Sequence, residues 1–182
     1  RAFGPKDTET PVVEAEQLAA ALAAFQRCLL LGDSPVDRFR AADVTELSME
    51  ARQGLWIFES RGRCWQCHSG ENLTDEKFHN TGVGFGSASR DLGRAEITHD
   101  PQDRYRFKTP SLRGVNETSP YMHDGSIKSL EDVVEFYSRG GAPDDPELSP
   151  LIRPLNLSDE ERRYLVEFLR ALSPARVESP TQ

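Results

Sequence analysis

Apolar positions recur with helical spacing near the end of the chain. In "LSDEERRYLVEFLRALSP" one stripe of the expected helix is formed by Tyr164, Leu165, Phe168, Leu169 and Leu172. Ser158 and Glu161 have the spacing of a capping box, and Pro174 ends the pattern. We therefore predict a late helix that begins at Ser158, buries this stripe in the core and is followed by a loose tail.

A second helix is predicted from Met49 to near Gly62, with Ser48 as its cap and Leu47 as a hydrophobic staple. Its apolar face contains Gly54, Leu55 and Phe58. Glycine inside a helix lowers its stability, so Gly54 indicates that another helix approaches closely there. We expect Met49 to be buried in the core.

Two further helices are predicted at residues 12–31, closed by Gly32, and within "SLEDVVEFYSRGG", capped by Ser129. The turn "GDSPVDRF" follows the first, and its aspartates cap or pair locally. Residues 70–128 are rich in glycine, proline and polar side chains. A loop region this long is unusual in a compact domain unless it wraps a bound group. The pattern favours an all-α fold.

Composition narrows the classes of function. The 182 residues are 37% hydrophobic and 29% charged, with a net charge of −8. This charge gives no electrostatic basis for binding nucleic acid or anionic membrane, and no apolar run is long enough for membrane insertion. The start is polar and abrupt, without a signal peptide, so we expect a processed chain or part of a longer one. Three cysteines are too few for a disulfide scaffold.

The segment "GRCWQCHSGENLT" carries the candidate chemistry, with Cys64 and Cys67 followed directly by His68. A zinc site needs four ligands, and no second CxxC is present. A thioredoxin-like motif needs a strand before the first cysteine, where a helix is predicted here. Two structural cysteines are a further alternative. The spacing C-x-x-C-H favours covalent attachment of one haem c, with His68 as an axial iron ligand.

Three separated stretches resemble the C-terminal half of the bacterial di-haem cytochrome c peroxidases and the related MauG group. They are "CWQCHSGENLTDEKFHNTGVG", "RFKTPSLRGVNETSPYMHDGSIKSLEDVVEFY" and "PLNLSDEERRYLVEFLRALS". The upstream "FQRCLLLGDSPVDRF" resembles the connecting helix of that family. The resemblance runs from about residue 15 to 173 and implies a connecting helix and linker in 1–46 and a cytochrome c-like haem domain with haem-wrapping loops in 47–182.

The family resemblance implies two haem domains, of which the C-terminal one takes electrons in and the N-terminal one reacts with peroxide. A calcium ion lies between them. This chain has a single CxxCH. It is therefore expected to be part of a peroxide-dependent oxidoreductase whose second haem is on a missing half or a partner chain, or to be a single-haem relative. Haem attachment needs an oxidising compartment, which indicates the periplasm.

The second axial ligand of the iron has several candidates. The position at which the peroxidases have a methionine is occupied by Tyr137, and the MauG group is similar in having a tyrosine there. A phenolate favours ferric iron. Met122 is the alternative, as is an open or histidine-ligated site; Tyr137 could also be an aromatic core residue whose hydroxyl reaches the surface.

Other assignments follow from the resemblance. Arg113 and Lys108 are expected at the haem propionates, or are solvated surface charges. His123 is expected to hydrogen-bond near the haem edge, or lies on the surface. Thr118 and Pro120 match calcium-binding carbonyls. We expect Trp65 to pack at the haem edge, and Cys28 is expected to be a buried free thiol.

Two functions from different classes remain. The first is the electron-transfer half of a di-haem peroxidase or MauG-like enzyme, which exchanges electrons with a donor or acceptor protein. The second is a stand-alone electron-carrier cytochrome without catalysis. A structural fragment with an incidental haem is a third reading, which the motifs do not favour.

Overall fold

The computed structural model describes residues 13–28 and 31–174. Contacts divide the chain into two units, residues 1–31 and 32–182. In the first unit, α1 (Ala15–Cys28) lies where the sequence predicts a helix, and none of its residues is buried. The predicted loose tail after Pro174 lies outside the described residues, as do residues 29 and 30 of the predicted first helix.

The second unit begins earlier than the boundary predicted after residue 46. Its first helix, α2 (Pro35–Arg40), has a capping box formed by Ser34 and Asp37, so its aspartate pairs locally as expected. The side chain of Val36 is only 1% exposed, and its N–H donates to the carbonyl of Ala171 at 3.4 Å. Residues before Leu47 therefore belong to the same core as the late helix.

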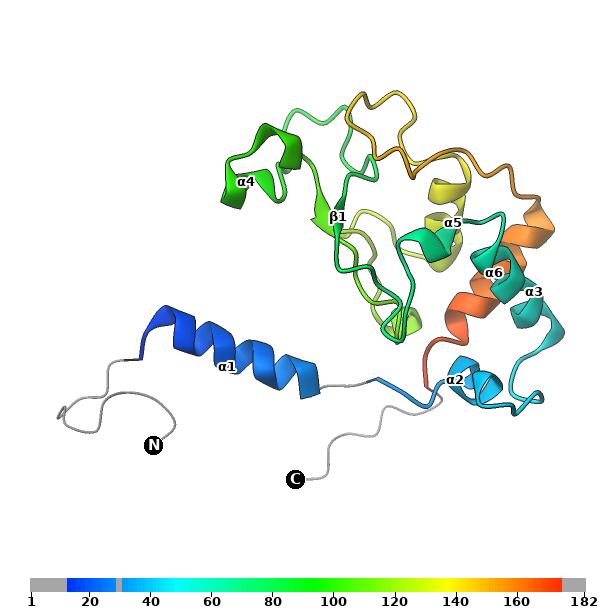
Figure 1. The fold of residues 1–182 in the computed structure, drawn as a ribbon. Helices are drawn as coiled ribbons and strands as arrows, with labels where there is room; N and C mark the ends of the chain where they lie inside the picture. The colour runs from blue at the N-terminus through cyan, green and yellow to red at the C-terminus, as the bar shows by residue number, and fades with distance from the viewer. Residues whose placement is uncertain (1–12, 29–30, 175–182) are drawn as a thin grey trace, which may run out of the picture. The chain divides into compact units, whose positions relative to one another are not determined.

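The core of the second unit forms where α3 (Met49–Glu59) packs against α6 (Asp159–Arg170), and α5 (Leu130–Ser138) also contacts α6. Figure 1 shows these helices together on one side of the unit. A Cβ at Gly54 would lie 2.0 Å from the carbonyl oxygen of Tyr164. The predicted close approach at Gly54 is confirmed, and Phe58 and Phe168 meet beside it with ring centroids 4.9 Å apart.

The predicted helix caps are present. The side chains of Ser48, Ser129 and Ser158 each accept from the backbone N–H three residues later, and Glu161 completes the box of α6. Such caps satisfy N–H groups that have no partner inside the helix. The apolar stripe of α6 is buried at Leu165, Val166, Phe168 and Leu169, while Tyr164 is half-buried.

Short elements occupy the long polar segment between α3 and α5. These are the 3-10 helices η1 (Cys64–Gln66), η2 (Pro101–Asp103) and η3 (Val115–Glu117), the helix α4 (Ala95–Thr98), and the strands β1 (Phe78–His79) and β2 (Phe107–Lys108). The strands pair antiparallel, with Phe78 opposite Lys108. The described fold is thus helix-rich, with a minimal two-stranded sheet in addition to the expected helices.

Two predictions of burial are wrong. Met49 is 63% exposed, because it is the first residue of α3 and lies outside the face that meets α6. Cys28 is exposed on α1, and its thiol donates to the carbonyl of Ala24 at 3.3 Å.

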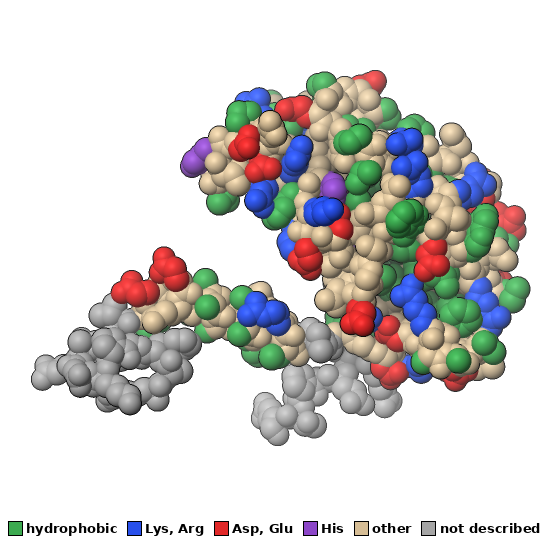
Figure 2. Space-filling model, in the orientation of Figure 1, with side chains coloured by type: hydrophobic (Ala, Val, Ile, Leu, Met, Phe, Trp, Pro, Cys, Tyr) green, Lys and Arg blue, Asp and Glu red, His purple; other side chains and the backbone are tan. Residues whose placement is uncertain are grey.

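Acidic and basic side chains are interspersed on the face of the second unit in Figure 2. That face shows no patch of a single sign.

Candidate functional site

The second unit contains a cavity of about 440 Å³, a size typical of small-molecule and cofactor sites. Its lining comes from the 62–68 turn, the β1 and β2 loops, the 109–123 segment, α5 and residues 151–155. Cys64, Cys67 and His68 all line it, as do Tyr137 and Met122. The structure therefore brings the main candidates of the sequence into one cavity.

A tight turn presents the two thiols and the imidazole. Arg63 adopts a left-handed conformation with φ 57°, and η1 follows directly. The N–H groups of Cys67 and His68 both donate to the carbonyl of Cys64, at 3.2 and 2.9 Å. Because the turn is closed by its own backbone, the three side chains are held at a fixed spacing.

Burial keeps both thiols of the motif protonated. It raises the pKa of Cys64 to about 12 and that of Cys67 to about 11, with a further rise for Cys67 from the charge of Asp75. Both cysteines are free thiols in the structure.

The imidazole of His68 is prepared for a metal. Its Nδ1 lies 3.0 Å from the carbonyl oxygen of Leu73, which can only accept, so Nδ1 carries the proton and Nε2 has a free lone pair. Burial lowers the pKa of His68, although hydrogen bonds to Leu73 and Pro110 oppose that shift. Leu73 is 3% exposed and has φ 51°. A neutral histidine fixed through its other nitrogen is the usual arrangement of a metal ligand.

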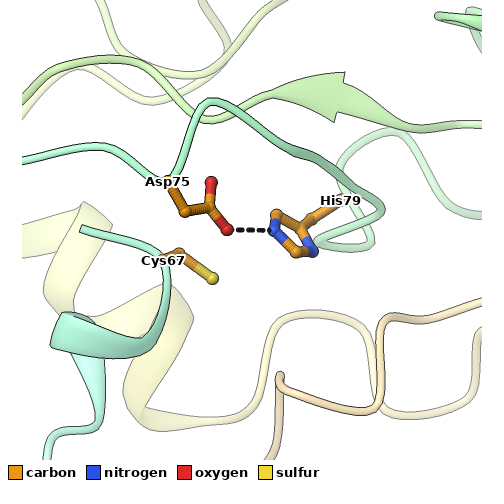
Figure 3. A group of neighbouring side chains, drawn as sticks. All are labelled: Cys67, Asp75 and His79. Atoms are coloured by element: carbon orange, nitrogen blue, oxygen red, sulfur yellow. Dashed lines mark hydrogen bonds and ion pairs between the residues drawn. The ribbon is translucent and has the colours of Figure 1, made fainter. Parts of the chain in front are cut away.

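A second group lies beside Cys67, as Figure 3 shows. Asp75 and His79 form a pair with 2.8 Å between Oδ2 and Nε2, and their ligand atoms lie within 4.8 Å of one another and of the Cys67 thiol. The sequence gives no indication that His79 or Asp75 approaches this cysteine. The group includes neither Cys64 nor His68, so it does not complete a tetrahedral site around the CxxCH motif.

Tyr137 and Met122 remain the two candidates for the second axial ligand. Burial raises the pKa of Tyr137 to about 12, and the charges of the two cysteines add to this rise. Tyr137 lines the cavity and is half-buried. Met122 lies in a loop closed by Tyr121 and Ile127, with φ 69°. Because both side chains line the cavity, the predicted ligation by Tyr137 stays a prediction.

Of the two predicted partners of the haem propionates, Lys108 lines the cavity and Arg113 does not. Lys108 lines the cavity and pairs with Glu76 at 2.5 Å. Arg113 is absent from the lining, and its guanidinium donates to both carboxylate oxygens of Asp37, the shortest distance being 2.8 Å. Arg113 thus already has an anionic partner from α2.

Of the remaining predicted residues, His123, Thr118 and Pro120 line the cavity and Trp65 does not. His123 is exposed and stacks on Phe107, with ring centroids 3.5 Å apart. Thr118 and Pro120 line the cavity, and the Thr118 hydroxyl donates to the carbonyl of Val115 at 3.0 Å. Trp65 is 47% exposed and is absent from the lining. None of these positions tests the assigned roles, which stay predictions.

Arg63 is a residue that the sequence analysis missed. It lines the cavity, and its Nε is buried without a hydrogen-bond partner in the described part of the chain. One terminal nitrogen donates to Gln66 at 3.1 Å. A buried donor without an acceptor destabilises a protein, so this atom indicates a cavity built for a group with polar edges.

These features fit a haem c. The donor set comprises two thiols, a histidine fixed with Nε2 free, and an unpartnered buried donor, in a cavity otherwise lined largely by apolar side chains. Apolar walls suit the faces of a porphyrin, and a CxxCH turn suits its thioether edge. The fold and the site together define a cytochrome c-like haem-binding domain.

Comparison with known proteins gives the family. The chain is 40% identical over 183 residues to the methylamine utilization protein MauG of Methylorubrum extorquens, covering 98% of this chain and 50% of that protein. It is 34% identical over 187 residues to the cytochrome-c peroxidase IdrP1 of Denitromonas iodatirespirans, covering 86% and 50%. The chain belongs to the family of MauG and the di-haem cytochrome c peroxidases. No protein-family model matches it.

A solved structure agrees with this family assignment. A MauG-like protein associated with microbial copper homeostasis superposes with a TM-score of 0.76 at 29% identity, covering 93% of this chain and 60% of that one. The chain spans about half the length of the curated relatives named above.

Within residues 13–28 and 31–174, none of the helices has the length and apolar character that crossing a membrane requires.

Proposed function

We propose that this chain is the haem c electron-transfer half of a di-haem oxidoreductase of the peroxidase or MauG type. It would pass electrons to or from a peroxide-reactive haem on a missing N-terminal half or on a partner. The observation that carries the proposal is that His68, fixed for metal binding, and Tyr137 line one cavity. The chain covers about half the length of these relatives, which supports a second haem domain in the part of them that it does not cover.

Each residue has a distinct role in this proposal. The thiols of Cys64 and Cys67 would hold the haem edge as thioethers, His68 would bind iron through Nε2, and Tyr137 would supply the second ligand. A bound haem c would supply reversible one-electron chemistry. The carbonyl of Leu73 keeps the proton on Nδ1 of His68, and so keeps the iron-binding lone pair on Nε2.

Two axial ligands would favour electron transfer over peroxide cleavage. The described lining of the cavity has no Asp or Glu side chain, although it includes His79 and His123. A peroxide-cleaving site needs an open metal position and an acid–base group placed over it. With His68 and Tyr137 as ligands, the open metal position would be missing in this half of the enzyme.

A stand-alone electron-carrier cytochrome is the second candidate. It is supported by Met122, which lines the same cavity and is a common ligand of such proteins. The two candidates differ in the axial ligand, so variants of Tyr137 and Met122 distinguish them.

Calcium, location and partners are further parts of the proposal. Thr118 and Pro120 would contribute to a calcium site shared with the second haem domain. Covalent haem attachment would require an oxidising compartment, so we expect the protein in the bacterial periplasm. An electron-donor or electron-acceptor protein would dock on the complete enzyme.

The test uses the haem-loaded chain. We expect one covalently bound haem by intact mass after acid–acetone extraction, reversible one-electron reduction in a spectroscopic redox titration, and low turnover of hydrogen peroxide. Robust peroxidase turnover by the single-haem chain would show that the peroxide-reactive centre lies here, and would overturn the proposal.

A further inference from the structure

Asn80 is the centre of a buried polar network that joins two distant segments. It is 2% exposed, and its Nδ2 donates to Oδ2 of Asp145 at 3.0 Å and to the carbonyl of Glu147 at 2.9 Å. Its Oδ1 accepts from the N–H of Gly82 and from Nη2 of Arg90, each at 2.9 Å. All hydrogen-bonding positions of the amide are therefore used, and a fully satisfied buried network makes the segments that it joins rigid.

Arg90 closes this network. Its Nη2 also donates to Oδ2 of Asp145 at 2.7 Å, and its Nε donates to the carbonyl of Val83 at 3.3 Å. The guanidinium lies over the ring of Tyr105, 3.9 Å from the centroid. We call Asn80, Arg90 and Asp145 the Asn80 network. It joins the segment after β1 to the loop after α5.

The two joined segments pack backbone to backbone. A Cβ at Gly141 would lie 2.4 Å from the carbonyl oxygen of Thr81. A Cβ at Gly82 would lie 2.6 Å from the Cβ of Ala142. Because neither contact leaves room for a further side chain, the turn after α5 keeps its place only while the segment after β1 keeps its own.

The turn after α5 is in turn bonded to the end of that helix. The N–H of Gly140 donates to the carbonyl of Tyr137 at 3.0 Å, and that of Gly141 donates to the carbonyl of Phe136 at 2.9 Å. Tyr137 lies in the last turn of α5 and lines the cavity. The contacts from the Asn80 network to the last turn of α5 are thus continuous, and they run through Thr81 and Gly141.

We propose that the Asn80 network positions the axial ligand, because it holds the end of α5, and with it Tyr137, at the wall of the cavity. This inference rests on the ligation by Tyr137 in the proposed function. The described lining of the cavity includes none of the three network residues, so they act on the ligand through the backbone path. A ligand on a rigid wall binds without a further cost of ordering. Loss of the network should therefore weaken the ligand without removing it.

The test compares variants of the haem-loaded chain by imidazole binding to the ferric haem. Imidazole must displace the resident axial ligand, so its apparent affinity reports how firmly that ligand is held. Asn80→Ala removes all the hydrogen bonds of the amide. It should bind imidazole about fivefold more tightly, an effect within the range for coupling through packed networks, and show a larger high-spin fraction before addition. Arg90→Gln should shift both readouts in the same direction, and it decides the test should Asn80→Ala fail to fold.

Val36→Ala is the matched control for a general loss of stability. Val36 is 1% exposed in the core of the same unit, lies outside the cavity lining and belongs to α2, away from the Asn80 network in the chain. Truncation of a buried side chain destabilises the fold, but it should leave imidazole affinity unchanged here. Chemical denaturation of each variant checks that it is folded under the conditions of the titration.

Three outcomes would overturn the inference, and they differ from one another. An equal gain of affinity in Val36→Ala and Asn80→Ala would mean that the effect is general instability. If Tyr137→Phe strongly raises the affinity but neither Asn80→Ala nor Arg90→Gln does, the network has no positioning role, while the ligand assignment stands. If Tyr137→Phe itself changes nothing, the ligand assignment fails, and this inference fails with it.

Discussion

Residues 64–68 supply two thiols and an imidazole to the cavity from five consecutive positions, whereas Thr81, Met122 and Tyr137 reach it from three separate segments. The first group is held by a turn that hydrogen-bonds to itself. The second is held by contacts between loops, above all the network of Asn80, Asp145 and Arg90. A local turn keeps its geometry through short-range bonds, while the other group depends on the whole unit staying folded.

The largest effect is expected from the local group. Cys64→Ala combined with Cys67→Ala should abolish covalent haem, because no thiol remains to form a thioether. The measurement is haem staining after denaturing electrophoresis, with intact mass. Cys28→Ala is the matched control and should retain the haem, since Cys28 is exposed on α1 in the other unit. Haem that stays attached in the double variant would contradict the assignment.

The second-largest effect is expected from loss of the proposed axial ligand. Tyr137→Phe should convert most of the ferric haem from low-spin to high-spin, because the phenolic oxygen is lost while the ring is kept. The reduction potential should rise as an anionic donor disappears. Optical spectroscopy and a redox titration measure both.

Met122→Leu is the matched control for this change, because Met122 lines the same cavity. It should leave the spectrum nearly unchanged. The reverse outcome, in which Met122→Leu opens the site and Tyr137→Phe does not, would make the chain a His/Met cytochrome and would favour the electron-carrier function.

The third prediction concerns the tertiary network. Asp145→Asn removes the partner of Arg90, which lies 2.7 Å away, with side-chain exposures of 1% for Asp145 and 10% for Arg90. Leaving a buried charge unpaired should cost about 3 kcal/mol in the free energy of unfolding. Asp144→Asn, at an exposed neighbouring position, is the control and should change stability little. Chemical denaturation of both variants measures the difference.

The same carboxylate predicts a pH dependence. Burial by itself would raise the pKa of Asp145, but hydrogen bonds from Arg90, the Glu147 backbone and Asn80 outweigh it and lower the pKa. A lowered pKa in the folded state means that the stabilisation is present above the unfolded value of about 3.9 and is lost as the pH falls below it. Asp145→Asn should therefore show a shallower loss of stability below about pH 4 than the unaltered chain. An unchanged acid slope would contradict this.

The smallest effect is expected in the helix pair. Gly54→Ala would place a methyl group 2.0 Å from the Tyr164 carbonyl and 2.7 Å from the Cβ of Phe168, so α3 and α6 must separate. Overpacking of this kind costs about 1–3 kcal/mol, partly offset by about 1 kcal/mol from better helix propensity. The melting temperature should fall by several degrees. Gln53→Ala, exposed on the same helix, should not lower it; an equal fall in both would refute the close-contact explanation.

Much of the helical frame was predictable because its signals are local. Ser48, Ser129 and Ser158 mark helix starts, since an N-cap bonds within its own first turn. Gly54 indicated a close contact, although not with which residue. Exposure was less predictable: Cys28 and Met49 are both exposed, because apolar character alone does not say which face meets a neighbour.

The pairings between distant charges could not be read from the chain. Asp145 meets Arg90 across 55 positions and Arg113 meets Asp37 across 76, and any of many arginines could have served. The approach of Asp75 and His79 to Cys67 is similar, since it depends on the path of the loop before β1.

The sequence by itself determined the family, the helix caps and the thiol–imidazole motif, because each depends on residues within a few positions or on similarity along the chain. The tertiary structure alone decided that Arg113 is already paired with Asp37 and that Met122 and Tyr137 line one cavity with the CxxCH turn. These facts depend on which loops meet, and loops meet only when the core of α3, α5 and α6 has fixed their ends.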